Sequence, residues 1–250
     1  MKDFFRKYKV YIIILLLLFI YFVVFSFLSG MVKEEDEKYA YIVVDGIGIW
    51  EYKNREWNTI LDSDFEESDS LYKIYSSNEY IGDYIVKINN SKLYAFDSKY
   101  NSLQYDGSIM GIESNYDINV ISFDYSSVNG NDEIILDNIT DKYSSYQAYA
   151  KKINIDIDNN EINDILYVID YYNVDDKLFS EIYLYSNNID LVPIIEYTGA
   201  YYNYYDVSYI LDIDNDGICE VILSSDYYSN ISYKIYKIKG KNVELFLEWF

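Results

Sequence analysis

The stretch Asp212-Ile-Asp-Asn-Asp-Gly-Ile-Cys-Glu220 leads directly into the apolar run Val221-Ile-Leu223. It places acidic side chains at positions 1, 3, 5 and 9 of a loop that turns on a glycine. Because Ca²⁺ binds about six to eight oxygen atoms at flexible distances, carboxylates at this spacing suit that ion. EF-hand loops place their bidentate Glu later and lie between helices, whereas a strand-like run follows here. The stretch therefore predicts a calcium loop inside a β-structure. The expected ligands are the carboxylates of Asp212, Asp214, Asp216 and Glu220 and the carbonyl oxygen of Ile218.

A second copy of this loop, Asp156-Ile-Asp-Asn-Asn-Glu-Ile-Asn-Asp164, lies 56 residues upstream. Over 17 ungapped positions 8 residues are identical, and Asp-Tyr-Tyr follows both loops at the same offset. Asn160 replaces an Asp, and Glu161 stands where a glycine would ease a turn with positive φ. We therefore expect the upstream copy to be the weaker calcium site. Its expected ligands are Asp156, Asp158, Asn160, the carbonyl oxygen of Ile162, and Asp164.

Four segments after residue 31 pair β-branched and aromatic residues across turns that contain Asn or Gly, which is the signal of a β-hairpin. Long helical periodicity is missing there, so the sequence predicts an all-β domain. A degenerate third copy of the loop spans 124–133, where an Asn129-Gly130 turn between two strands is the favoured interpretation. The predicted hairpins span 49–60, 84–96, 182–197 and 233–247.

The downstream loop belongs to a predicted four-stranded unit. Strands at about 207–211 and 219–225 flank the loop, the final hairpin adds two more, and segment 150–197 repeats this order. Four antiparallel strands per repeat are typical of β-propeller blades. The sequence therefore predicts a small or partial β-propeller of four or five four-stranded blades, with a β-sandwich as the alternative. Shorter versions of the unit can be drawn around 39–80, 81–125 and 118–149.

The two acidic loops, with the strands that follow them, resemble the calcium loops of the VCBS/FG-GAP repeat family. Members of that family are similar to the propellers of integrin α-subunits. The resemblance covers two units well and a third poorly, and the chain lacks the Phe-Gly and Gly-Ala-Pro signatures and the length for the usual seven blades. The resemblance implies calcium ligation by the residues named above, and it implies adhesion or ligand binding more often than catalysis.

The apolar run Val10–Leu28 contains 19 residues without a charge. A helix of that length crosses the roughly 30 Å hydrocarbon core of a membrane. Basic residues precede the run and acidic residues follow it, so the positive-inside rule places 1–9 in the cytoplasm. We expect a single-pass transmembrane helix at 10–28, a charged linker at 29–38 and an extracellular β-repeat domain at 39–250. Secretion after cleavage of a signal peptide is the alternative.

Charge and composition narrow the function. A net charge of −22 repels phosphate backbones, so a nucleic-acid partner is not expected. The chain has no histidine, which excludes Ser-His-Asp and Cys-His catalysis and His-ligated zinc. We therefore expect a membrane-anchored, extracellular, calcium-binding module that binds a protein or glycan and has no catalytic residues. A carboxylate-dependent enzyme acting on glycans and a scaffold of a cell-envelope complex are the alternatives. The Tyr-rich segment 197–205 offers either a ligand surface or packing between units.

Overall fold

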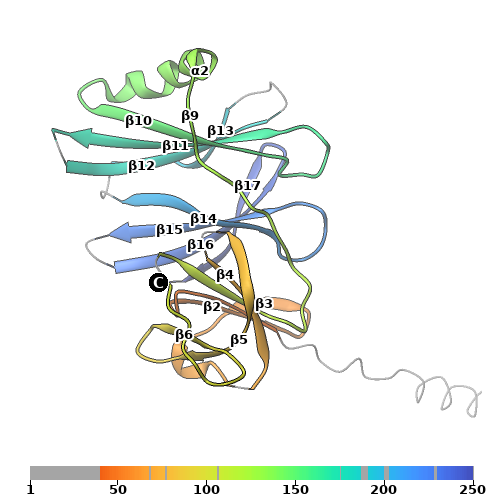
Figure 1. The fold of residues 1–250 in the computed structure, drawn as a ribbon. Helices are drawn as coiled ribbons and strands as arrows, with labels where there is room; N and C mark the ends of the chain where they lie inside the picture. The colour runs from red at the N-terminus through yellow and green to blue at the C-terminus, as the bar shows by residue number, and fades with distance from the viewer. Residues whose placement is uncertain are drawn as a thin grey trace, which may run out of the picture. The chain divides into compact units, whose positions relative to one another are not determined.

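Three antiparallel β-sheets stack on one another in the computed structural model of the chain (Figure 1). Strands account for most of the described residues, so the predicted all-β class is confirmed. The described residues are 40–67, 69–76, 78–105, 107–174, 176–186, 191–199, 203–227 and 230–249.

The first sheet has seven strands in the order β3-β2-β1-β7-β4-β5-β6. Here β7 pairs with both β1 and β4, which leaves neither of those two strands with an open edge. This order corrects the expectation of separate four-stranded units around 39–80 and 81–125, because β7 joins both segments into one sheet. The strands are β1 (Ala40–Val44), β2 (Gly48–Lys53), β3 (Glu56–Thr59), β4 (Leu71–Ser76), β5 (Glu79–Ile88), β6 (Leu93–Phe96) and β7 (Ile109–Glu113).

The other two sheets are four-stranded meanders with one short strand added at an edge. The second sheet contains β10 (Gln147–Ile155), β11 (Asp164–Asn173), β12 (Asp176–Tyr185) and β13 (Leu191–Ile195), with β9 (Ser126–Ser127) at its edge. The central sheet contains β14 (Tyr204–Asp212), β15 (Glu220–Tyr227), β16 (Asn230–Lys239) and β17 (Asn242–Trp249), with β8 (Asn119–Val120) at its edge. In both meanders an acidic loop joins the first strand to the second. All four predicted hairpins are confirmed, as β2–β3, β5–β6, β12–β13 and β16–β17.

The central sheet is buried on both faces because its apolar side chains point alternately to either side. Val221 and Leu223 of β15 pack in one cluster with Leu166 of the second sheet. Ile222, between them, packs in another cluster with Trp50 and Ile112 of the first sheet. Within the described part of the chain the sheets stack as layers and close no ring, which supports the sandwich-like alternative.

Strand β17 also connects the central sheet to the first sheet. The hydroxyl of Thr59 donates to the carbonyl oxygen of Glu248 at 2.9 Å. The indole N–H of Trp249 donates to the carbonyl oxygen of Ile60 at 3.1 Å. Two hydrogen bonds therefore connect β17 with β3 and the residue after it, 189 positions apart in each case.

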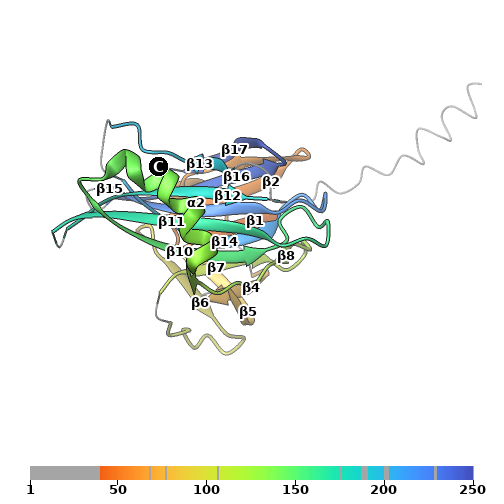
Figure 2. The same ribbon diagram turned by 90° about the horizontal axis from the view of Figure 1, so that it is seen from above.

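Residues 118–149 contain a helix rather than the expected short β-unit. Helix α2 (Gly130–Thr140) begins after Asn129, and a capping box with Asp132 satisfies its first N–H groups. Leu136 and Ile139 pack on the aromatic outer face of the second sheet, over which α2 lies in Figure 2. The expected Asn129-Gly130 turn between strands is therefore wrong. Two short 3-10 helices, η1 (Asp62–Asp64) and η2 (Asp141–Tyr143), complete the helical elements of the described residues.

The predicted transmembrane helix at 10–28 lies outside the described residues, as do the segments 1–9 and 29–38. Among the residues that are described, no helix has both the length and the apolar character that a membrane span needs. The predicted anchor therefore stays a prediction.

Two candidate metal centres and an adjoining pocket

The upstream loop (156–164) and the downstream loop (212–220) hold their first Asp in the same way. Both carboxylate oxygens of Asp212 accept backbone N–H groups, from positions 5 and 6 of its loop, at 3.1 and 3.0 Å. Asp156 accepts from the same two positions at 3.0 and 2.8 Å. The two loops thus share one hydrogen-bonded frame, although position 5 is Asn in one and Asp in the other.

The missing glycine does not prevent the upstream loop from turning. Glu161 adopts a φ of 68° where Gly217 adopts 84°, and the Asn residues two positions earlier in each loop also have positive φ. A non-glycine residue pays roughly 1 to 2 kcal/mol for this conformation, which the matching hydrogen bonds offset. The loops also touch, because the N–H of Cys219 donates to the carbonyl oxygen of Ile157 at 2.8 Å.

Position 9 supplies a carboxylate that is withdrawn from solvent in both loops. Asp164 and Glu220 are both 0% exposed, and each accepts the N–H of position 2 of its loop, at 3.1 and 2.8 Å. Position 7 donates its own N–H to the position 5 side chain, at 2.8 Å for Ile162 and 3.0 Å for Ile218. The oxygens of Asp156, Asp158 and Asp164 lie within 4.8 Å of one another, as do those of Asp212, Asp214 and Asp216.

The downstream loop already holds a cation. Lys237 of β16 directs its Nζ into the loop, 2.6 Å from Asp214 Oδ2 and 2.9 Å from Asp216 Oδ2. It also lies 2.9 Å from Oε1 of Glu220, as an ion pair without hydrogen-bond geometry. The Lys237 side chain is only 6% exposed. The residues present therefore do not fit a bound metal ion as they stand, because an ammonium group stands among the expected ligands.

The upstream loop has no such counter-charge. Oδ1 of Asp158 and Oδ1 of Asp164 are buried and accept no hydrogen bond from the described residues. Among the described residues, no Lys or Arg forms an ion pair with the three Asp side chains of this loop. Buried carboxylate oxygens without a partner are costly, and a cation between them removes that cost. The upstream donor set of hard oxygens therefore fits Ca²⁺.

The acid–base properties of the two loops follow from burial. Burial raises the pKa of Glu220 to about 7, and the Ile213 N–H and the Lys237 ammonium only partly oppose it. Burial alone would lower the pKa of Lys237, but the three carboxylates in contact with its ammonium outweigh burial and raise it. Burial and the negative charges of the neighbouring carboxylates raise the pKa of Asp164, against the hydrogen bonds from Ser186 and Ile157. Burial thus disfavours the ionised form of both carboxylates, and among the described residues only the downstream one has an ammonium beside it.

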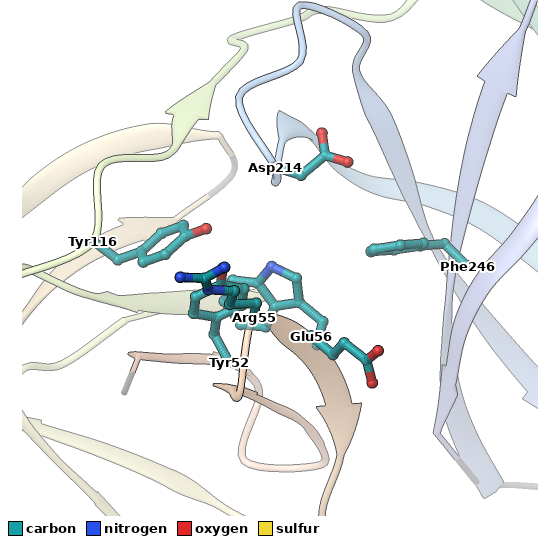
Figure 3. A pocket seen from close by; sticks show the side chains of 7 residues that line it. Tyr52, Arg55, Glu56, Tyr116, Asp214 and Phe246 are labelled. Atoms are coloured by element: carbon teal, nitrogen blue, oxygen red, sulfur yellow. The ribbon is translucent and has the colours of Figure 1, made fainter. Parts of the chain in front are cut away.

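A pocket of about 360 Å³ borders the downstream loop (Figure 3). Three aromatic rings form one wall, with centroids 5.1 to 5.4 Å apart: Tyr52, Trp57 and Tyr116. Figure 3 shows Asp214 and Phe246 on other sides of the space. The carboxylates of Glu56 and Asp214 and the guanidinium of Arg55 supply polar groups. The pocket therefore combines apolar ring faces with charged hydrogen-bonding groups.

In the Tyr-rich segment 197–205, the described side chains of Tyr197 and Tyr205 pack against the sheets. Tyr197 stacks on Phe179 with ring centroids 4.0 Å apart, and Tyr205 packs against the core between the second and central sheets. Residues 200–202 lie outside the described residues.

No protein-family model matches the chain, and comparisons with curated proteins and with solved structures find no match. The geometry of the two loops and the pocket is therefore the basis for a functional proposal. Sequence reasoning found both loops but missed Lys237 and the aromatic pocket. Lys237 could have been found from the sequence, because the register of the hairpin β15–β16 pairs it with Glu220.

Proposed function

We propose that this chain is a membrane-anchored extracellular binding module whose upstream loop takes up Ca²⁺ and whose pocket binds a glycan. The observation that carries the calcium part is the pair of buried, unpartnered oxygens on Asp158 and Asp164. The meanders β10–β13 and β14–β17, stacked face to face with an acidic loop after the first strand, support a blade-like unit related to VCBS/FG-GAP repeats. The anchor at 10–28 and the extracellular location rest on the sequence alone.

Calcium is expected to stabilise the protein. If Kd is about 10⁻⁴ M, as for weaker extracellular calcium modules, ~1 mM Ca²⁺ adds about 1.4 kcal/mol to the free energy of unfolding. For a chain of this size that corresponds to an increase in Tm of about 3 to 6 °C. The full chain in detergent micelles is melted with Ca²⁺, with Mg²⁺ and with chelator, and Trp fluorescence reports unfolding. Mg²⁺ should act more weakly, because it demands stricter octahedral geometry.

Two Asn variants locate the ion. Asp158→Asn removes one charge from the upstream loop and should abolish most of the calcium shift. Asp216→Asn makes the downstream loop match the upstream loop at position 5 and should leave the shift in place. A shift that survives Asp158→Asn and disappears in Asp216→Asn would move the proposed site to the downstream loop. If neither calcium nor chelator changed the Tm, the proposal that this protein binds calcium would be wrong.

The pocket supports a saccharide ligand. Its volume lies at the small end of the range for ligand sites, which suits one or two sugar rings. The C–H faces of a sugar pack on aromatic rings, while its hydroxyl groups bond to carboxylate and guanidinium groups. Trp57 is only 8% exposed, so the half-buried Tyr116 offers the more accessible ring.

Tyr116→Ala is therefore expected to weaken glycan binding roughly tenfold, because it removes one ring of the wall. A glycan array with the full-length protein identifies the ligand, and titration of the strongest hit measures the loss. Tyr149→Ala is the matched control, since Tyr149 is 61% exposed on β10 of the second sheet, outside the pocket lining. A hit bound equally well by both variants would exclude the pocket. Hydrolysis of the glycan, lost on Glu56→Gln, would favour the enzyme alternative instead.

A further inference from the structure

The register of the sheets gives each loop a facing residue on the third strand of its meander. In the central sheet Glu220 pairs with Lys237, and the next pair is Val221 with Tyr236. In the second sheet the equivalent of that next pair is Ile165 with Tyr185. One step further along the chain, Ser186 therefore stands where the central sheet has Lys237. The two loops face different residues, a serine upstream and a lysine downstream.

Lys237 reaches the place that a metal ion would need. Its Nζ lies 2.6 to 2.9 Å from oxygens of positions 3, 5 and 9 of the downstream loop. The ring of Phe246, with its centroid 6.0 Å from Nζ, lies close to the ammonium group. Because Ca²⁺ binds oxygens at about 2.3 to 2.6 Å, an ion bound to these oxygens would contact the ammonium and be repelled by it. The ammonium and the ion therefore exclude each other.

We propose that Lys237 is the resident cation of the downstream loop, a tethered ammonium that replaces Ca²⁺ and makes this loop independent of metal. The loop with the more complete calcium motif is then the one that does not bind the ion. The downstream carboxylates also have a second ammonium nearby, since Lys239 Nζ lies 3.5 Å from Asp216. That the upstream loop is the remaining calcium site rests on the proposed function. The replacement by Lys237 stands on its own contacts.

The hydroxyl of Ser186 is too short and carries no charge to play the same part. It forms a hydrogen bond with Asp164, yet Oδ1 of that carboxylate stays without a partner. A reciprocal exchange of the two facing residues should therefore exchange the metal dependence of the two loops.

Calcium stoichiometry tests the proposal. Equilibrium dialysis of the full-length protein in detergent against Ca²⁺ should give one ion per chain in wild type and two in Lys237→Ser. In Ser186→Lys no ion should bind, and in the double exchange one ion should bind and be lost on Asp214→Asn. Removal of Lys237 should raise the affinity of the downstream loop for Ca²⁺ on the order of 100-fold. The ion then no longer has to displace an ammonium from the buried carboxylates. Lys237→Met, which keeps an aliphatic stem beside Phe246, gives the same test if the serine variant does not fold.

The outcomes separate the two proposals. No ion in wild type and one in Lys237→Ser would support the tethered cation and contradict calcium binding upstream. Two ions in wild type, or one ion that Asp214→Asn abolishes, would overturn the tethered cation. A folded Lys237→Ser or Lys237→Met that binds no more calcium than wild type would overturn it as well.

Discussion

Glu181→Leu is expected to lower the free energy of unfolding by about 3 kcal/mol. Glu181 of β12 is 0% exposed on the outer face of the second sheet. Its Oε2 accepts from the hydroxyls of Tyr171 and Tyr183, both at 3.1 Å. Its Oε1 accepts from the N–H of Tyr197 at 3.0 Å and from the hydroxyl of Tyr143 at 3.3 Å. A leucine would remove this acceptor in a largely apolar layer. The hydroxyl of Tyr143 can still donate to the carbonyl oxygen of Tyr197 at 3.2 Å, so three donors lose their bond at a cost of about 1 kcal/mol or more each.

Glu196→Leu is the matched control for this effect. Both carboxylates pair with Lys142, at 3.1 Å for Glu181 and 2.9 Å for Glu196, but Glu196 is 55% exposed. An exposed ion pair contributes about 1 kcal/mol or less, so this variant should unfold close to wild type. Urea unfolding followed by fluorescence gives both free energies at one pH and salt concentration. Equal losses in the two variants would mean that the buried tyrosine bonds add nothing beyond the ion pair.

Gly46→Ala is expected to cost at least about 3 kcal/mol, through two independent causes. Gly46 lies in the turn between β1 and β2 with a φ of 74°, which an L-residue adopts only with strain. A Cβ there would also stand 2.3 Å from the backbone nitrogen of Leu93 and 2.4 Å from the carbonyl carbon of Lys92. No side-chain rotation relieves a clash with backbone, so the turn or strand β6 must move.

Gly240→Ala separates these two causes. Gly240 has a similar φ of 59° in the turn between β16 and β17, but no atom lies within 4 Å of the added Cβ. Its substitution should cost only the conformational strain, about 1 kcal/mol. The difference between the two variants, measured by urea unfolding, then reports the close backbone approach at β6. If Gly46→Ala were no more harmful than Gly240→Ala, the backbone at Lys92 and Leu93 would not constrain this turn.

Local patterns predicted the hairpins and the two acidic loops because their signals lie within a few neighbouring residues. Strand β7 was not predicted as the link between β1 and β4, since no local feature states which distant edges a strand will join. The sequence pattern did not predict helix α2, although Asn129 and Asp132 form a capping box at its start. Its buried side chains are few, so the helical period is weak there.

In the candidate site, too, the local features were predicted and the cross-strand neighbours were not. The spacing of carboxylates in 212–220 correctly indicated a turned loop with converging side chains. The expectation that the downstream loop is the stronger calcium site rested only on residues within each loop. The residue that faces each loop comes from another strand, and the registers of β15 against β16 and of β11 against β12 determine which residue it is. The cross-strand neighbour of the last ligand therefore determines whether such a loop faces a positive charge.

The attachment of β17 to β3 has a consequence for the order in which the protein matures. Thr59 and Trp249 take part in bonds between residues 189 positions apart. During synthesis the first sheet emerges long before the strand that fastens its edge exists. The first sheet must therefore wait, with the edge of β3 unfastened, until β17 has been synthesised. Contacts of such separation slow folding, because a long loop must close before they form. A chain that is cut short before β17 would leave that edge unfastened and open to pairing with other molecules.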